Sequence, residues 1–378
     1  MANWQTSLRV GALLGLRQVQ RANIWMNILI ILIMTLTFMN LVVVSGILVG
    51  LIEGGNRANR EQYSGDVLIS ELPTESVIKN TQPLLSTLRS LDSVEVFSER
   101  YVSGAQVEAN YQTRRDFNEL PNQVGSSVVG IDVERENQVT GLSNYIIDGE
   151  YLRPGESGFI LIGATLLDQY SNFSDLFEPL RDVNPGTKVK VTVSGSGDFI
   201  SFEDLNQDTD DDPNNRVQEF IVKGVVDTKV DEVSTRIFMS ESDFRRLTGR
   251  NSLFANEIAV RKAAGVQDET IKQALIDSGF GEFAKIQTAR EAIPKFLDDI
   301  RITFGILGNV IGLIGIIVSV ITIFVVIYIN AITRRKYIGI LKGIGVQGRA
   351  IRYAYIIQAM FYALIGSIIG FVIIYALL

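Results

Sequence analysis

Residues 334–352, RRKYIGILKGIGVQGRAIR, form a short basic segment between two long uncharged stretches. The segment contains six basic residues and no acid, and the flanking stretches, 302–333 and 353–378, are 32 and 26 residues long. Because a helix rises about 1.5 Å per residue, about 20 apolar residues are enough to cross a hydrocarbon core of about 30 Å. The sequence therefore predicts two membrane-spanning helices joined by a basic loop.

The distribution of charge predicts which side of the membrane each part faces. All 42 acids lie within residues 53–301, where they outnumber 26 bases and give a net charge of −16. The other nine bases lie in residues 1–52 and in the segment 334–352. Lysine and arginine collect on the cytoplasmic side, where anionic lipids attract them and from which they are poorly translocated. We therefore expect residues 334–352 to be cytoplasmic and residues 53–301 to be extracytoplasmic.

The first 52 residues predict an interfacial helix followed by a retained membrane span. In residues 1–22, helical spacing separates an apolar face from three arginines, which is typical of a helix lying along the inner leaflet. The apolar face comprises Trp4, Leu8, Ala12 and Val19, and the arginines are Arg9, Arg17 and Arg21. The uncharged run 22–52 is 31 residues long. The apolar region of a cleaved signal peptide has about 7 to 15 residues, so this run is interpreted as a span.

Each of the three spans contains residues that predict helix packing inside the membrane. Glycines four residues apart let helix backbones approach closely, and buried amides face other helices. These residues are Gly46 and Gly50, Gly308 and Gly312, Gly366 and Gly370, together with Asn27, Asn40 and Asn309. No span contains an ionisable residue, which disfavours an ion channel or an ion-coupled transporter.

The composition excludes several kinds of chemistry. The chain has no histidine and no cysteine, so it cannot form a Ser-His-Asp or Cys-His nucleophile or a His-ligated zinc site. It also lacks the GxxxxGK[ST] phosphate loop, so any ATP-driven work requires a separate ATPase. The basic residues outside 53–301 adjoin membrane spans, and nucleic acid is therefore not an expected partner.

The acidic middle of the chain has the pattern of a mixed soluble domain. Short strand-like runs alternate with helical spacing, and the order strand, helix, strand occurs near the start, at 66–97, and again near the end, at 257–286. The other expected strands are 128–131, 159–162, 188–193, 220–226 and 237–239, and the expected helices are 74–91, 163–170, 240–247 and 268–278. This order predicts two βαβ halves packed as an α+β domain, with a β-rich insert between them.

The string RRKYIGILKGIG resembles the cytoplasmic coupling helix of MacB/FtsX-type ABC transporter permeases, a superfamily that includes the lipoprotein-releasing LolC and LolE subunits. The stretch 128–152, VVGIDVERENQVTGLSNYIIDGEYL, is similar to their periplasmic core domain. Tyr337 and Gly343 depart from the acid and the alanine that are usual in the family. The resemblance assigns ATPase coupling to Arg334, Arg335, Lys336, Ile338, Gly339, Leu341, Lys342 and Gly345.

The pattern within this segment leaves two interpretations open. Ile338, Leu341 and Ile344 recur at spacings of three and four, which predicts a short amphipathic helix at the inner membrane surface. Such a helix contacts lipid in one interpretation and docks a cytosolic partner in the other.

The resemblance also implies a fold class and a division of the chain. It implies an α-helical membrane part with three visible spans, a fourth span as is usual in the family, and a large α+β extracytoplasmic domain. Residues 293–333 are predicted to form one helix about 60 Å long, about twice the hydrocarbon thickness, with Pro294 in its first turn. The expected parts are an interfacial helix (1–22), the first span (23–52), the extracytoplasmic domain (53–292), a stalk with the second span (293–333), the coupling segment (334–352) and the third span (353–378).

The implied function is that of a non-catalytic permease subunit in the cytoplasmic membrane, working by mechanotransmission. The expected partners are a cytosolic ABC ATPase, which would bind ATP and magnesium, a second copy or a paralogous permease, the lipid bilayer, and a periplasmic adaptor or lipoprotein. No cofactor is expected in this chain. Lipoproteins, lipids, peptides and hydrophobic toxins are all plausible cargo. The alternative is a membrane-anchored, FtsX-like regulator whose external domain controls a partner such as a cell-wall hydrolase.

The acidic stretch 204–215, DLNQDTDDDPNN, has two interpretations. Counting from Asp208, acids occupy positions 1, 3, 5 and 12 of an EF-hand-like calcium loop. Pro213 stands at position 6, where the sharp turn requires glycine. Clusters of Asp, Asn and Pro also favour exposed turns, so the pattern favours a solvated hairpin tip over a calcium site.

The predicted topology can be tested with single cysteines. We expect Asp210→Cys to react with a membrane-impermeant thiol reagent in intact cells and Gln347→Cys to remain unlabelled. The chain has no native cysteine, so each signal reports one position. Permeabilised cells are the control, since both positions should react there. The reverse pattern in intact cells would contradict the topology.

Overall fold

The computed structural model describes residues 4–21, 24–114, 121–171, 178–194, 215–250, 254–293 and 295–377. The chain divides into two compact units, one made of Met1–Ile52 with Lys295–Leu378 and the other of Glu53–Pro294. The first unit contains the apolar stretches, and we call it the membrane unit; the second contains the acidic middle, and we call it the acidic unit. Most of the predicted calcium loop, residues 208–214, lies outside the described residues.

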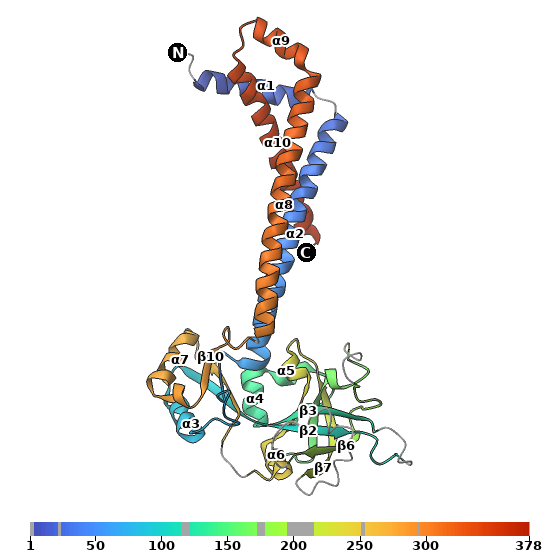
Figure 1. The fold of residues 1–378 in the computed structure, drawn as a ribbon, viewed down its shortest axis with the longest axis vertical. Helices are drawn as coiled ribbons and strands as arrows, with labels where there is room; N and C mark the ends of the chain where they lie inside the picture. Colours follow the sequence, from blue (N-terminus) through green and yellow to red (C-terminus); the bar gives the residue numbers. More distant parts are fainter. Residues whose placement is uncertain are drawn as a thin grey trace. The chain divides into compact units, whose positions relative to one another are not determined.

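Among the described residues, the membrane unit contains five helices, which Figure 1 labels. They are α1 (Trp4–Gln20), the first part of α2 (Ile24–Asn59), α8 (Lys295–Thr333), α9 (Arg335–Gly343) and α10 (Gly348–Leu377). Three stretches of the described chain are long and apolar enough to cross a membrane, namely Ile24–Ser64, Ile302–Thr333 and Gly348–Ala376. Helix α8 is continuous over 39 residues, which corresponds to about 58 Å.

Helix α1 packs on the beginning of α10 through small residues, a contact that the sequence analysis did not predict (Figure 1). A Cβ atom at Gly15 would lie 2.7 Å from the carbonyl oxygen of Ala354, and one at Gly11 would lie 2.7 Å from Tyr353 Cβ. Ser7 Oγ also donates a hydrogen bond to Gln347 Oε1 at 3.1 Å. The face of α1 that packs on α10 is therefore the face with small side chains, while Leu8 and other leucines of α1 remain exposed.

A second glycine contact joins α10 to α2. A Cβ atom at Gly366 would lie 2.6 Å from Met34 Cβ, and one at Gly370 would lie 2.7 Å from Phe38 Cδ1. By contrast, no described atom lies within 4 Å of the Cβ position at Gly46, Gly50 or Gly312. Close approach through paired glycines is thus observed within this chain at the third predicted span.

Hydrogen bonds inside the membrane unit connect α1, α2 and α10. The hydroxyl of Tyr362 donates to Asn27 Oδ1 at 2.5 Å, and Asn27 Nδ2 donates to the carbonyl of Val19 at 2.9 Å. Gln358 Nε2 donates to the Tyr362 hydroxyl at 3.2 Å. In contrast, none of the described side chains of α8 is buried. Three helices therefore form a packed group, and α8 contributes little to it.

The described residues of the acidic unit form one sheet of ten strands, in the order β10-β1-β9-β2-β3-β8-β5-β7-β4, with β6 paired to β2 and β7. The strands are β1 (Val67–Ser70), β2 (Val94–Glu108), β3 (Gln123–Ile131), β4 (Ile146–Gly149), β5 (Phe159–Gly163), β6 (Lys188–Val193), β7 (Arg216–Val226), β8 (Arg236–Ser240), β9 (Glu257–Lys262) and β10 (Lys285–Thr288). Its helices are α3 (Thr81–Ser90), α4 (Val133–Thr140), α5 (Asp231–Ser234), α6 (Glu241–Thr248) and α7 (Asp268–Asp277).

Both faces of this sheet are buried. Alternate residues of a strand point to opposite faces, and neighbours such as Leu68 and Ile69 belong to two different apolar clusters. Leu85 of α3, Phe244 of α6 and Ile271 of α7 belong to the cluster on one face. Val133 of α4 belongs to the cluster on the other face. Burial on both faces explains why the strands read as short apolar runs as well as alternating ones.

The two strand-helix-strand segments interlock within the one sheet. In the order β10-β1-β9-β2, each segment contributes alternate strands, and β1 pairs antiparallel with both β9 and β10. The β-rich insert is also not a separate sheet. Strand β2 is 15 residues long and pairs with β9 over its first part and with β3 and β6 over its second, so the insert continues the same sheet.

Two of the predicted helices also differ. The expected helix 74–91 is α3, which begins at Thr81, and the expected helix 163–170 is one 3-10 turn, Ala164–Leu166. Helix α4 was not predicted, because its sequence, VERENQVT, has few apolar residues. It is fixed by Asp132, whose side chain accepts from the backbone of Glu134 and Arg135, and by Gly141, which ends it with a positive φ.

The contact between α1 and α10 predicts an unequal effect of two alanine substitutions. Gly15→Ala places a Cβ against a backbone carbonyl, and such overpacking lowers the free energy of unfolding by about 1–3 kcal/mol. We therefore expect a lower melting temperature for the detergent-solubilised variant. Gly46→Ala is the matched control, because no described atom lies near its Cβ position. Equal melting temperatures for the two variants would contradict the contact.

Candidate functional site

The candidate site is the nine-residue helix α9 and the turn that leads to α10. The turn is a Schellman motif, in which Gly345 N donates to the carbonyl of Lys342 and Val346 N donates to that of Leu341, each at 3.0 Å. Gly345 has a φ of 93°, a value that residues with a Cβ rarely adopt. Leu341 and Val346, which such a motif brings into contact, are both half-buried. The glycine therefore ends α9 and turns the chain into α10.

The apolar residues of α9 divide into an outward and an inward set. Tyr337, Ile340 and Ile344 are 69%, 60% and 74% exposed. Ile338 and Leu341 are half-buried. Residues spaced by three and four share a face of a helix, so the exposed three form one apolar surface, which we call the α9 face.

Basic side chains surround the α9 face. Arg335, Lys336 and Lys342 are exposed, and Arg334 is half-buried at the start of the helix. In the part of the chain that the structure describes, none of these four forms an ion pair. The surface is thus apolar in its centre and positive around it, with no acid in 334–352 to neutralise it.

All the residues that the sequence assigned to ATPase coupling lie in this one helix and its turn. Of the three residues expected to supply the contact surface, Ile344 is exposed, whereas Ile338 and Leu341 are half-buried. Gly345 has the structural role described above. The resemblance to coupling helices did not single out Tyr337 and Ile340, and the spacing alone could not, because two apolar rows at spacings of three and four run along the same short helix.

No group of three or more acidic side chains placed to hold a metal ion occurs within the described ranges. The α9 segment itself contains no carboxylate. Its apolar and cationic side chains can contact a partner protein or lipid.

Residues 309–378 match the family described as FtsX-like permease C-terminal. The resemblance to MacB/FtsX-type permeases is confirmed. The matched residues include all of α9, all of the described part of α10 and most of α8. The candidate site therefore lies within the part of the chain that matches the family.

Two solved structures are similar to the chain, both at low identity. The periplasmic region of MacB from Actinobacillus actinomycetemcomitans is 14% identical, with a TM-score of 0.38 over 60% of this chain and 90% of that chain. A permease-protein domain from Porphyromonas gingivalis is 12% identical, with a TM-score of 0.33 over 63% of this chain and 96% of that chain. None of the curated proteins matches the sequence.

The end of α9 predicts opposite effects for two glycine substitutions. Gly345→Ala puts a Cβ on a residue with positive φ, so we expect faster hydrogen exchange at the amides of residues 340–346. Gly339→Ala lies inside the helix with no atom near its Cβ position, and alanine favours a helix by about 1 kcal/mol over glycine. Exchange in that variant should be slower or unchanged. Equal exchange in both variants would contradict the Schellman turn.

Proposed function

We propose that the chain is the transmembrane permease subunit of an ABC transporter in the cytoplasmic membrane, and that it couples ATP hydrolysis to movement of an extracytoplasmic domain. The observation that carries this proposal is the α9 face, an exposed apolar surface with a basic surround between two candidate spans. Such a segment matches what a cytosolic ATPase needs from a membrane partner, namely a short helix that can seat in a groove of the ATPase.

The α9 face offers enough apolar surface to support docking to a partner protein. Burying three such side chains against a partner contributes roughly 1.5–3 kcal/mol each, before the cost of association is subtracted. The exposed bases around it favour a groove with an acidic rim, because complementary charge speeds association and fixes register. ATP and magnesium would be bound by that partner, since this chain lacks a phosphate loop.

Helix α8 is our candidate for the element that carries the motion. It leads directly into α9, and its 39 residues exceed the length needed to cross the bilayer about twofold. Because none of its described side chains is buried within the unit, few contacts oppose a shift of α8 against α1, α2 and α10. In this proposal the excess length is an extracytoplasmic stalk.

The proposed cargo is handled outside the membrane, since no predicted span has an ionisable residue to line a polar pathway. Lipoproteins, lipids, peptides and hydrophobic toxins all fit this mode of work. The permease would act as a homodimer or with a paralogous subunit, and with a periplasmic adaptor or lipoprotein. The match to FtsX-like permeases favours a second candidate as well, a regulator whose external domain controls a partner such as a cell-wall hydrolase without moving cargo.

The docking role predicts that a charge on the α9 face uncouples the protein without unfolding it. We expect Ile340→Asp to insert in the membrane at the wild-type level but to lose the ATPase that copurifies with the wild-type chain. The reason is that an unpaired carboxylate would be buried in an apolar contact. ATP hydrolysis by the complex should lose its dependence on the permease to the same degree.

The matched control is Ile147→Asp, which places the same change at an exposed isoleucine of the acidic unit. This variant should retain the ATPase at wild-type stoichiometry. If Ile340→Asp also retains it and supports normal hydrolysis, the α9 face is not the ATPase contact, and lipid contact becomes the better account of the segment.

A further inference from the structure

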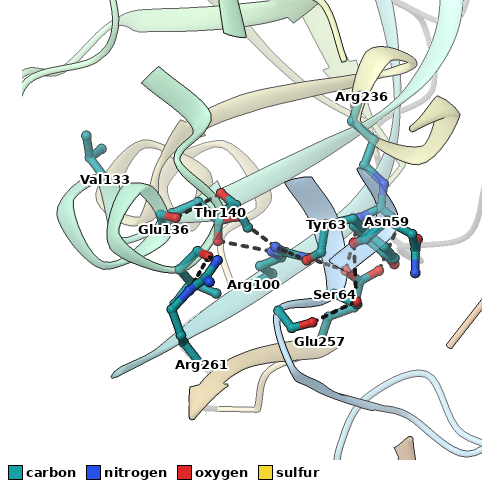
Figure 2. A network of polar contacts seen from close by, with 12 residues as sticks. Asn59, Tyr63, Ser64, Arg100, Val133, Glu136, Thr140, Arg236, Glu257 and Arg261 are labelled. Atoms are coloured by element: carbon teal, nitrogen blue, oxygen red, sulfur yellow. Dashed lines mark hydrogen bonds and ion pairs between the residues drawn. The ribbon is translucent and has the colours of Figure 1, made fainter. Parts of the chain in front are cut away.

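The acidic unit contains a cluster of buried charges centred on Arg100 of β2 (Figure 2). Arg100 has a side chain that is 2% exposed. Its Nε and Nη2 donate to the two carboxylate oxygens of Glu136 on α4, at 3.0 and 2.8 Å. Its Nη1 donates to Glu257 Oε2 on the neighbouring strand β9, at 3.4 Å. One guanidinium group therefore joins β2, β9 and α4.

Glu257 extends the cluster to strand β8. Arg236 donates to both oxygens of Glu257, at 3.1 and 2.9 Å. Burial raises the pKa of Glu257, but the charges of Arg236 and Arg100, together with hydrogen bonds, outweigh this effect and lower the pKa to about 2. The formal charges of the two arginines and of Glu136 and Glu257 cancel, so these four side chains together have no net charge.

The end of α2 is also held in this cluster. After Asn59 the helix continues as a π-helical turn, Arg60–Ser64, which brings Tyr63 between the two arginines. The Cζ atoms of Arg100 and Arg236 lie 5.1 and 5.4 Å from the centroid of the Tyr63 ring. The carbonyl oxygen of Tyr63 accepts a hydrogen bond from Arg100 Nη2 at 2.7 Å. Both the side chain and the backbone of this turn are thus fixed.

Further contacts hold the residues of this turn and the glycine that follows it. Gln62 Oε1 accepts from the backbone of Lys229 at 2.9 Å, and Arg60 Nε donates to Asp66 Oδ1 at 2.7 Å. Gly65 follows directly and is packed against β9, since a Cβ there would lie 2.6 Å from the carbonyl oxygen of Val260. Hinges in moving proteins are a few loop or terminal residues that can absorb large φ and ψ changes. Residues 60–65 are instead held by hydrogen bonds and by close packing against β9.

Buried ion pairs of this kind fix geometry more than they add stability. The desolvation of the charges cancels much of their attraction, so apolar side chains of the same size often serve as well. Moving one member away, however, leaves another buried charge without its partner, which is strongly unfavourable. The four charged side chains of the cluster are bonded to one another, and Arg100 is bonded to the π-helical turn Arg60–Ser64. They therefore resist displacement of β2, β8, β9, α4 and this turn relative to one another.

The first residues of α4 line a cavity of about 450 Å³. Residues 132–134 form one side of it, and residues 240–242 with Arg245 form another, at the beginning of α6. The parallel strands β3 and β8 both end at this cavity, where Ile131 is paired with Ser240. The carboxyl ends of neighbouring parallel strands are where crevices form in such sheets. Glu136, one turn into α4, thus connects the buried cluster to a wall of the cavity.

We propose that this cluster, the Arg100 joint, makes the π-helical turn Arg60–Ser64 and helix α4 move as one body, so that displacement of this turn alters the cavity between α4 and α6. Arg100, Tyr63 and Glu136 are positioning residues of the joint. The inference concerns contacts within the acidic unit and does not depend on docking of an ATPase, so the two can fail separately.

The test is a distance measurement between spin labels in the full chain, at Arg57→Cys on α2 and Gln138→Cys on α4. Both positions are exposed, and the chain has no other cysteine. Labelled protein is diluted with unlabelled protein, so that only pairs within one chain contribute. We expect a narrow distance distribution in this background. It should become at least twofold broader with Tyr63→Leu, which removes the ring from between the arginines, and with Glu136→Gln, which removes one buried charge.

The matched control is Glu150→Gln, the same change in an exposed ion pair with Arg153. It should leave the width of the distribution unchanged. Circular dichroism of each variant separates loosening of the joint from loss of the fold, and Tyr63→Leu decides the outcome if Glu136→Gln does not fold. A broad distribution without either substitution, or unchanged widths in the folded variants, would overturn the proposal.

Discussion

The neutralisation of Arg100 is the constraint on which the acidic unit depends. A guanidinium group that is buried on β2 requires acids within reach, and the sheet and α4 supply Glu257 and Glu136. That requirement places α4 against the sheet although its own sequence has little apolar surface. Arg100 also holds the π-helical turn that follows α2, because the Tyr63 carbonyl accepts a hydrogen bond from Arg100 Nη2. The polar cluster therefore decides positions that hydrophobic burial alone leaves open.

The membrane unit is held together by a different interaction, the close approach of helix backbones. Lipid tails are as apolar as leucine, so apolar side chains give little preference for protein over lipid, whereas small residues permit tight packing. Gly11 and Gly15 of α1, and Gly366 and Gly370 of α10, supply these contacts. Helix α8 has no buried side chain among its described residues. A unit with one weakly packed helix next to a contact surface is suited to transmitting a shift, which is the role we propose for it.

The sequence located the candidate site but not the side of its helix that faces outward. The positive charge, the apolar spacing and the resemblance to coupling helices all identified residues 334–352, and the family match covers the same segment. They did not identify its outward side, because Tyr337, Ile340 and Ile344 form one row and Ile338 and Leu341 form another on the same helix. Which row faces outward depends on how α9 packs against its own unit, and a local pattern contains no such information.

The sequence by itself determined the candidate spans, the uneven charge and most of the strands, since each follows from the composition or the period of a few consecutive residues. It did not determine that β1 lies between β9 and β10, that the insert continues the main sheet through β2, or that α1 rests on α10. These contacts join residues that are far apart in the chain. Only the tertiary structure decided them, because strand order and helix contacts depend on the summed burial of the whole unit and on partners such as Glu136 and Glu257, whose role cannot be read from their neighbours in sequence.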